Sequence, residues 1–279
     1  MTSNYQKQFT YIFDRPITEE AWYWTPQQES VLGEEDTLTS FDFIEQLCLT
    51  AKIDLAPFSN DQIGVGLNYV FNHSQLVHDF KNADVPFERR EKAVRSLFFL
   101  FRDVLNPRCN PELGHKAKVS QSKLNDFCYM FWDVSPLATW IKFANSEQMG
   151  LLFMAGLSDS ELENMQLPEG VLEMMKQQID QMKEAALTPE DIAANVQQQY
   201  QNMDAETKGY YEAIADVMHN CLALSNPACV ESGLHGLGHT ATFLPDIAVP
   251  IIDMFLKNTE HKNKDLLNYA ETAQTGMIL

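Results

Sequence analysis

The positions of the apolar residues predict helices along most of the chain. These residues recur every three to four positions in one segment after another, and few stretches alternate with a period of two. That spacing places the apolar side chains of a segment on one face of a helix. Helices are therefore predicted over residues 40–52, 61–72, 86–105, 121–132, 136–143, 158–167, 169–186, 188–203, 209–224, 226–239, 245–257 and 263–274.

Residues 86–105 form the strongest of these patterns. Val94, Leu97, Phe101 and Leu105 share one face, and neighbouring apolar residues widen it, so we expect this helix to be central. Short turns marked by proline or asparagine join the predicted helices, which favours antiparallel pairs. The sequence therefore predicts an all-α protein of stacked antiparallel helix pairs, forming a single domain over residues 1–279.

Residues 1–38 do not fit this scheme. They are rich in aromatic side chains, among them Phe9, Phe13, Trp22 and Trp24, with acidic residues and a proline between them. We expect an irregular N-terminal segment, extended or folded as a short hairpin, whose aromatic rings pack on the first helices.

Two segments resemble repeats of the HEAT and armadillo class. Residues 83–97 read ADVPFERREKAVRSL, and residues 226–239 read NPACVESGLHGLGH. In both, an Asp or Asn is followed closely by Pro and then by a helical pattern, as is common in repeats of that class. The resemblance implies an irregular α-solenoid that binds other proteins, and it implies no catalytic residue.

Residues 226–239 also contain an unusual number of glycines. Gly233, Gly236 and Gly238 remove side-chain bulk from the predicted helix, so a neighbouring segment can approach it closely. Each glycine inside a helix costs about 0.5–1 kcal/mol relative to alanine. Close packing or a ligand must offset that cost.

Glu231, His235 and His239 lie four residues apart and share one stripe of this helix. Two such histidines can share a metal ion, and a carboxylate can complete a catalytic zinc site. However, the three residues span about 12 Å at 1.5 Å per residue, and Gly236 stands where zincin enzymes have their catalytic Glu. The favoured interpretation is a helix whose histidines bond to neighbouring groups. No cofactor is predicted, and a metal ion at these residues is the alternative.

Other segments carry weaker signals. Residues 127–132, FCYMFW, are typical of a core, and Asp133 after them is expected to cap the next helix. Cys109 with His115 could form a reactive dyad, but a cysteine in a polar turn is usually unreactive. The sequence contains no G-x-S-x-G elbow and no phosphate-binding loop.

The composition limits the partners and the location. The chain has 39 Asp and Glu against 20 Lys and Arg, a net charge of −19. Nucleic acid is therefore not an expected partner, because binding phosphates requires clustered basic residues. No apolar run approaches the roughly 20 residues of a membrane span, and the first residues lack the pattern of a secretory signal. The five cysteines form no paired motif, so we expect reduced thiols and a cytoplasmic protein.

The acidic residues are concentrated in the second half of the chain. Residues 124–279 have 22 Asp and Glu against 7 Lys and Arg, whereas residues 79–123 have a net charge of +4. We therefore expect a non-enzymatic, acidic inhibitor or immunity-type protein that neutralises a basic partner such as a bacterial toxin or an enzyme. Candidate contact residues are Glu161, Glu163, Glu173 and Glu184. Two alternatives are a metal-dependent hydrolase that uses Glu231, His235 and His239, and a helical scaffold.

Overall fold

The structure is a computed structural model, and its described residues belong mainly to one part of the chain. They are residues 3–24, 38–73, 80, 85–117, 122–135, 137, 201–258, 263–276 and 278, with single positions between 170 and 198. The chain divides into two compact units, Met1–Trp140 with Ala205–Leu279, and Ile141–Asp204. The single domain expected over residues 1–279 stays a prediction.

The protein is all-α, as predicted, and the described residues contain helices but no strand. The helices of the first unit are α1 (Asn4–Phe13), α2 (Ser40–Asp54), α3 (Asn60–Asn68), α4 (Phe87–Leu100), α5 (Asn106–Arg108), α6 (Lys123–Val134), α11 (Ala205–Cys221), α12 (Pro227–Phe243), α13 (Pro245–Lys257) and α14 (Lys264–Gln274). Two π-helical segments, η3 (Tyr69–His73) and η5 (Phe101–Leu105), continue α3 and α4. Two short 3₁₀ helices, η1 (Trp22–Trp24) and η6 (Gly114–Lys116), lie in the connections.

Polar side chains at the helix starts explain where the helices begin. The Ser59 hydroxyl accepts a hydrogen bond from the backbone N–H of Gln62, whose side chain accepts from the Ser59 N–H, forming a capping box. Ser122 and Asn226 cap α6 and α12 in the same general way. The helix predicted over residues 40–52 begins at Ser40, as expected, with Thr39 in the N-cap position of α2.

The prediction of an irregular segment over residues 1–38 is wrong for its first part, because Asn4–Phe13 forms helix α1. Tyr5, Phe9, Ile12 and Phe13 are all buried on one face of this helix. Their spacing is helical, but the aromatic and acidic residues after them conceal the pattern. Aromatic rings of this segment pack on the helices that follow, since Tyr5 lies against Phe43 of α2 and Trp22 lies against Tyr69 of η3.

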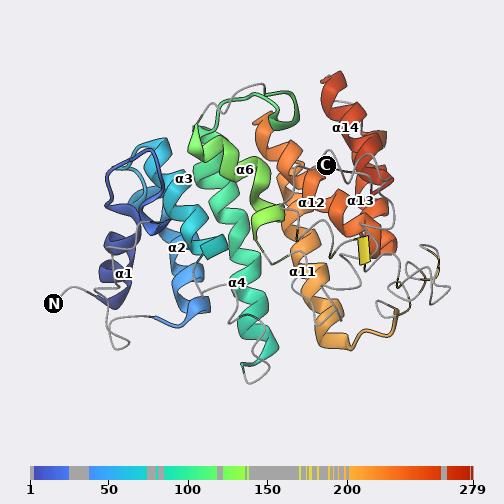
Figure 1. Cartoon of the computed structure of the whole chain (residues 1–279), viewed down its shortest axis with the longest axis horizontal. Coiled ribbons are helices and arrows are strands. Elements are labelled where there is room, and N and C mark those ends of the chain that lie inside the picture. Colours follow the sequence, from blue (N-terminus) through green and yellow to red (C-terminus); the bar gives the residue numbers. More distant parts are fainter. Residues whose placement is uncertain are drawn as a thin grey trace. The chain divides into compact units, whose positions relative to one another are not determined.

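The contacts between the helices of this unit form two rows, and within each row every helix contacts the next (Figure 1). In one row α2 contacts α4, α4 contacts α11, and α11 contacts α13; in the other α3 contacts α6, α6 contacts α12, and α12 contacts α14. Helix α4, expected to be central, lies between α2 and α11. Helix α12 contacts α6, α11, α13 and α14. The HEAT and armadillo resemblance of residues 83–97 and 226–239 stays a prediction.

The glycines of α12 lie where its neighbours come closest. A Cβ atom on Gly236 would lie 2.6 Å from the Met218 side chain and 2.7 Å from the Trp132 ring. A Cβ on Gly233 would lie 2.8 Å from the backbone oxygen of Met218, and one on Gly238 would overlap the Ile278 side chain. Real Cβ atoms do not approach other atoms so closely, so the predicted close packing of this helix is confirmed.

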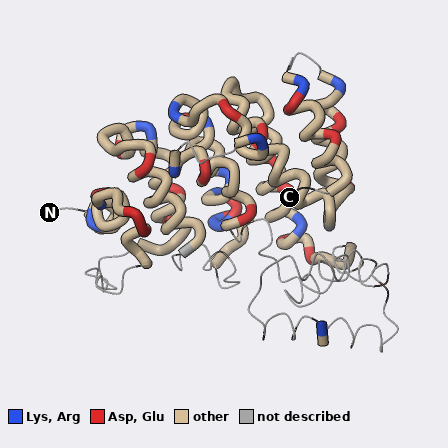
Figure 2. Tube along the Cα trace, turned by 45° about the horizontal axis from the view of Figure 1, so that its top comes forward, with Lys and Arg blue, Asp and Glu red and all other residues tan. Residues whose placement is uncertain are grey.

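The basic residues of α4 are paired within the unit. Arg89 pairs with Asp42 and Glu45 of α2, and Lys92 also reaches Glu45. Further along the helix, Arg90 pairs with Glu206 and Arg95 with Asp216, both in α11. Figure 2 shows basic and acidic positions interspersed along the helices of this unit. These ion pairs thus join α4 to its two neighbours, α2 and α11.

Candidate functional site

The predicted site residues Glu231, His235 and His239 form one stripe of α12. Asn226 starts the helix by accepting a hydrogen bond from the Ala228 N–H, and the three residues follow at four-residue intervals. The side chain of Glu231 is fully buried and that of His235 is 1% exposed, whereas that of His239 is 28% exposed. The stripe therefore runs from the interior of the unit toward solvent.

Glu231 does not lie with the two histidines. Its carboxylate accepts hydrogen bonds from the backbone N–H groups of Gly114, at 2.6 Å, and His115, at 3.1 Å. It also pairs with the Nδ1 atom of His115. The connection around η6 thus supplies the partners of this buried carboxylate. Glu231 therefore does not act with His235 and His239 as the predicted set of three metal ligands. The Cys109 thiol is buried and lies against the Leu124 carbonyl.

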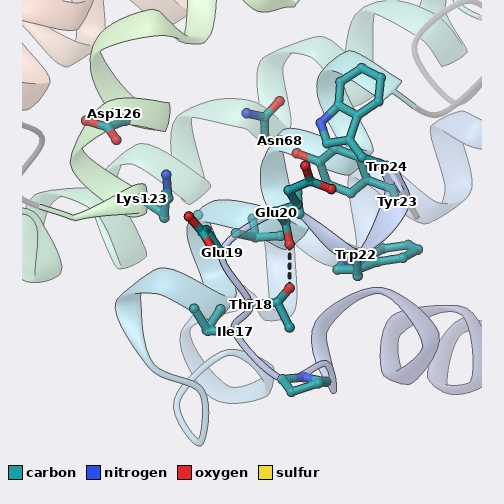
Figure 3. Close-up of a pocket in the computed structure, with 14 residues that line it drawn as sticks. Ile17, Thr18, Glu19, Glu20, Trp22, Tyr23, Trp24, Asn68, Lys123 and Asp126 are labelled. Atoms are coloured by element: carbon teal, nitrogen blue, oxygen red, sulfur yellow. Dashed lines mark hydrogen bonds between the residues drawn. The ribbon is translucent and has the colours of Figure 1, made fainter.

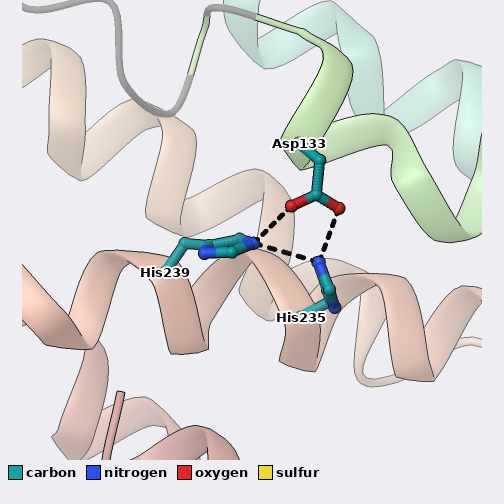
Figure 4. A group of neighbouring side chains, drawn as sticks. All are labelled: Asp133, His235 and His239. Atoms are coloured by element: carbon teal, nitrogen blue, oxygen red, sulfur yellow. Dashed lines mark hydrogen bonds and ion pairs between the residues drawn. The ribbon is translucent and has the colours of Figure 1, made fainter. Parts of the chain in front are cut away.

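The carboxylate that accompanies the histidines comes from α6 (Figure 4). Asp133 Oδ2 lies 2.7 Å from His235 Nε2, and Asp133 Oδ1 lies 2.7 Å from His239 Nε2. The two Nε2 atoms are 3.0 Å apart. The side chain of Asp133 bonds to α12, and the helix it was expected to cap, residues 136–143, lies almost entirely outside the described residues. We call Asp133, His235 and His239 the histidine cluster.

Hydrogen bonds control the charge of Asp133. Burial alone would raise its pKa, but the hydrogen bonds from His235 and His239 outweigh burial and hold the pKa well below its ordinary value. The carboxyl group is therefore ionised at neutral pH. An ionised carboxylate facing two imidazole nitrogens can accept two protons in hydrogen bonds or share a cation with them.

Two tyrosines support His235 from the other side of its ring. Tyr269 Oη lies 2.5 Å from His235 Nδ1, and the ring of Tyr129 lies 5.0 Å from that of His235. Burial raises the pKa of Tyr269 far above its ordinary value, and the neighbouring Tyr129 raises it further. Tyr269 therefore stays neutral and keeps its hydroxyl proton.

A separate pocket of about 640 Å³ lies between the α1–η1 connection, α3 and α6. Figure 3 shows the carboxylate of Glu20 beside the rings of Tyr23 and Trp24. Glu19 and Asp126 add two further carboxylates to the lining, and Lys123 contributes one cation. We call this the aromatic–acidic pocket.

The aromatic side of this pocket belongs to a larger group of rings. Trp22 and Tyr23 both pack on Tyr69 of η3, with ring centroids 4.7 and 5.7 Å apart. The Arg15 guanidinium lies 4.8 Å from the centre of the Trp22 ring. Trp24 continues the group and is 63% exposed, although most large apolar side chains of the described residues are buried. The group thus already holds one guanidinium and presents a tryptophan to solvent.

Sequence reasoning missed this pocket, although two signals pointed to it. Residues 17–24 read ITEEAWYW, so only Ala21 separates two adjacent glutamates from a run of three aromatic residues. The sequence could not predict that these residues line one pocket, because residues of α3 and α6 form the rest of its lining. The predicted contact residues Glu161, Glu163, Glu173 and Glu184 lie outside the described residues, and their role stays a prediction.

Comparison with protein-family models, with curated proteins and with solved structures finds no match for this chain. Among the described residues, no helix is long and apolar enough to cross a membrane. The histidine cluster and the aromatic–acidic pocket are the two features of the described residues whose chemistry indicates a function.

Proposed function

We propose that this protein is an acidic binding module that neutralises a basic protein, as an inhibitor or immunity-type protein does. In this proposal the aromatic–acidic pocket receives an arginine or lysine side chain of the partner. The observation that carries it is the position of Glu19, Glu20 and Trp24 around one opening.

The chemistry of the pocket suits a side chain with an apolar stem and a cationic end. The stem of arginine or lysine can lie along an aromatic ring while its charge meets carboxylates. A cation over an aromatic ring contributes about 0.5–2 kcal/mol, with the larger values at desolvated sites. The contact between Arg15 and Trp22 is an internal example of this pairing.

The distribution of charge supports the same partner. The net charge of −19 attracts a basic protein at long range. The cations of α4 pair with carboxylates of α2 and α11, so they do not form a separate basic surface that would repel it. Long-range attraction would speed the encounter with the partner, and the specific pocket would then stabilise the complex once it has formed.

Affinity capture from native cytosol tests the proposal. The wild-type protein should retain a basic protein in near-stoichiometric amount, and the double variant Glu20→Gln/Trp24→Ala should lose most of it. The matched control is Met254→Ala/Glu271→Gln, which changes an exposed apolar residue and an exposed carboxylate on α13 and α14. Retention of the same basic protein by the pocket variant, or capture of acidic proteins alone, would contradict the proposal.

A further inference from the structure

The histidine cluster has no part in the proposed binding of a basic protein, and its geometry has a different use. We propose that Asp133, His235 and His239 bind one divalent transition-metal ion, with zinc as the ion that best fits these ligands. Among the described residues, these three offer one ligand atom each, and the atoms all lie within 4.8 Å of one another. Figure 4 shows all three polar ends directed toward one point.

The donor atoms select the class of metal. Two imidazole nitrogens and one carboxylate oxygen suit zinc and its neighbours in the first transition row, whereas calcium and magnesium prefer oxygen ligands alone. Ligand atoms bound tetrahedrally at 2.0–2.1 Å from zinc stand about 3.3 Å apart. With Asp133 Oδ2 as the ligand, its 2.7 Å separation from His235 Nε2 and the 3.0 Å separation of the two histidine nitrogens would widen by a few tenths of an ångström. The third pair, Asp133 and His239, already lies within 4.8 Å.

Tyr269 can stabilise the tautomer of His235 that a metal requires. Without metal, His235 Nε2 donates to Asp133. With a metal bound at Nε2, the ring proton would sit on Nδ1, where Tyr269 Oη can accept it at 2.5 Å. The Tyr269 hydroxyl can in turn donate to Tyr129, with which it forms a hydrogen bond. Such an outer partner is usual for metal-bound histidine and raises metal affinity.

The cluster is also accessible to an ion. The side chains of Asp133 and His239 are 26% and 28% exposed, while His235 is buried. Entry from solvent can therefore occur past the two outer ligands. Because Asp133 belongs to α6 and the histidines to α12, a bound ion would join two helices that are distant in sequence, and we expect it to raise the melting temperature.

Titration of chelator-stripped protein with Zn²⁺, in competition with a chromophoric chelator, tests this proposal. The wild type should bind one ion per chain, and its Co²⁺ form should show the visible absorption of a tetrahedral site. Asp133→Asn and His239→Ala should each weaken Zn²⁺ binding more than 100-fold, whereas Tyr269→Phe should weaken it 10- to 100-fold, as outer partners do.

His219→Ala is the matched control, because it removes an exposed histidine of α11 and should leave Zn²⁺ binding unchanged. Circular dichroism in the absence of metal establishes that each variant is folded, and His239→Ala is the least disruptive because its side chain is partly exposed. No stoichiometric Zn²⁺ binding by the wild type, or equal binding by folded His239→Ala, would overturn the proposal.

Discussion

At the scale of single residues, Gly236 determines how closely α12 can pack. A Cβ at this position would meet both Met218 and Trp132 at less than normal contact distance. We therefore predict that Gly236→Leu lowers the free energy of unfolding by about 1–3 kcal/mol or more, through overpacking. Urea denaturation measures this change. Gly170→Leu is the control, because a Cβ on Gly170 would meet nothing within 4 Å; equal stability of the two variants would contradict the packing argument.

The histidine cluster shows what spacing along one helix can and cannot predict. His235 and His239 were expected to face the same way because they are four residues apart, and their rings do lie together. Asp133 could not be assigned to them, since it lies 102 residues from His235 in sequence. Helical periodicity does not predict which other helix packs beside α12. Glu231, on the same helix, was therefore the only carboxylate that the spacing could place near the two histidines.

At the scale of elements, Asn226 starts α12 and also anchors it. Its side-chain oxygen accepts from the Ala228 N–H, and its Nδ2 donates to the carbonyls of Asn106 and Cys109. We predict that Asn226→Ala costs about 2–4 kcal/mol of stability, because the cap is lost and two carbonyls lose their donor. Ser59→Ala, which removes only a cap, should cost about 1 kcal/mol. Thermal unfolding compares the two, and similar losses would show that the anchoring bonds contribute little.

Helix positions were predicted well where the helical period of the apolar residues is clear. The ranges 245–257 and 263–274 nearly coincide with α13 and α14. The π-helical segment η5 was not foreseen, because its apolar residues continue the pattern of α4 and give no sign of the wider turn. Helix α1 was missed because its aromatic residues were grouped with Trp22 and Trp24 in one irregular segment, which concealed their helical spacing.

At the scale of the whole molecule, the excess of negative charge governs encounter with a partner. Exposed charges are screened beyond about 8 Å at physiological ionic strength. We predict that high salt slows association with the captured basic protein far more than it speeds dissociation. Reversing Glu161, Glu163, Glu173 and Glu184 should likewise slow association, and Trp24→Ala should mainly speed dissociation. Surface plasmon resonance separates the two rates, and an association rate insensitive to salt and to the reversals would mean that the acidity serves only solubility.

The division of the chain has a consequence for how its length can vary. The stretch from Ile141 to Asp204 leaves the first unit after α6 and returns to it before α11. The residues that bring α6 and α12 together, among them Trp132 and Gly236, all belong to the first unit. Insertions or deletions between Trp140 and Ala205 therefore leave every residue of that contact unchanged. We expect the contact between the two helices to persist in chains of different length.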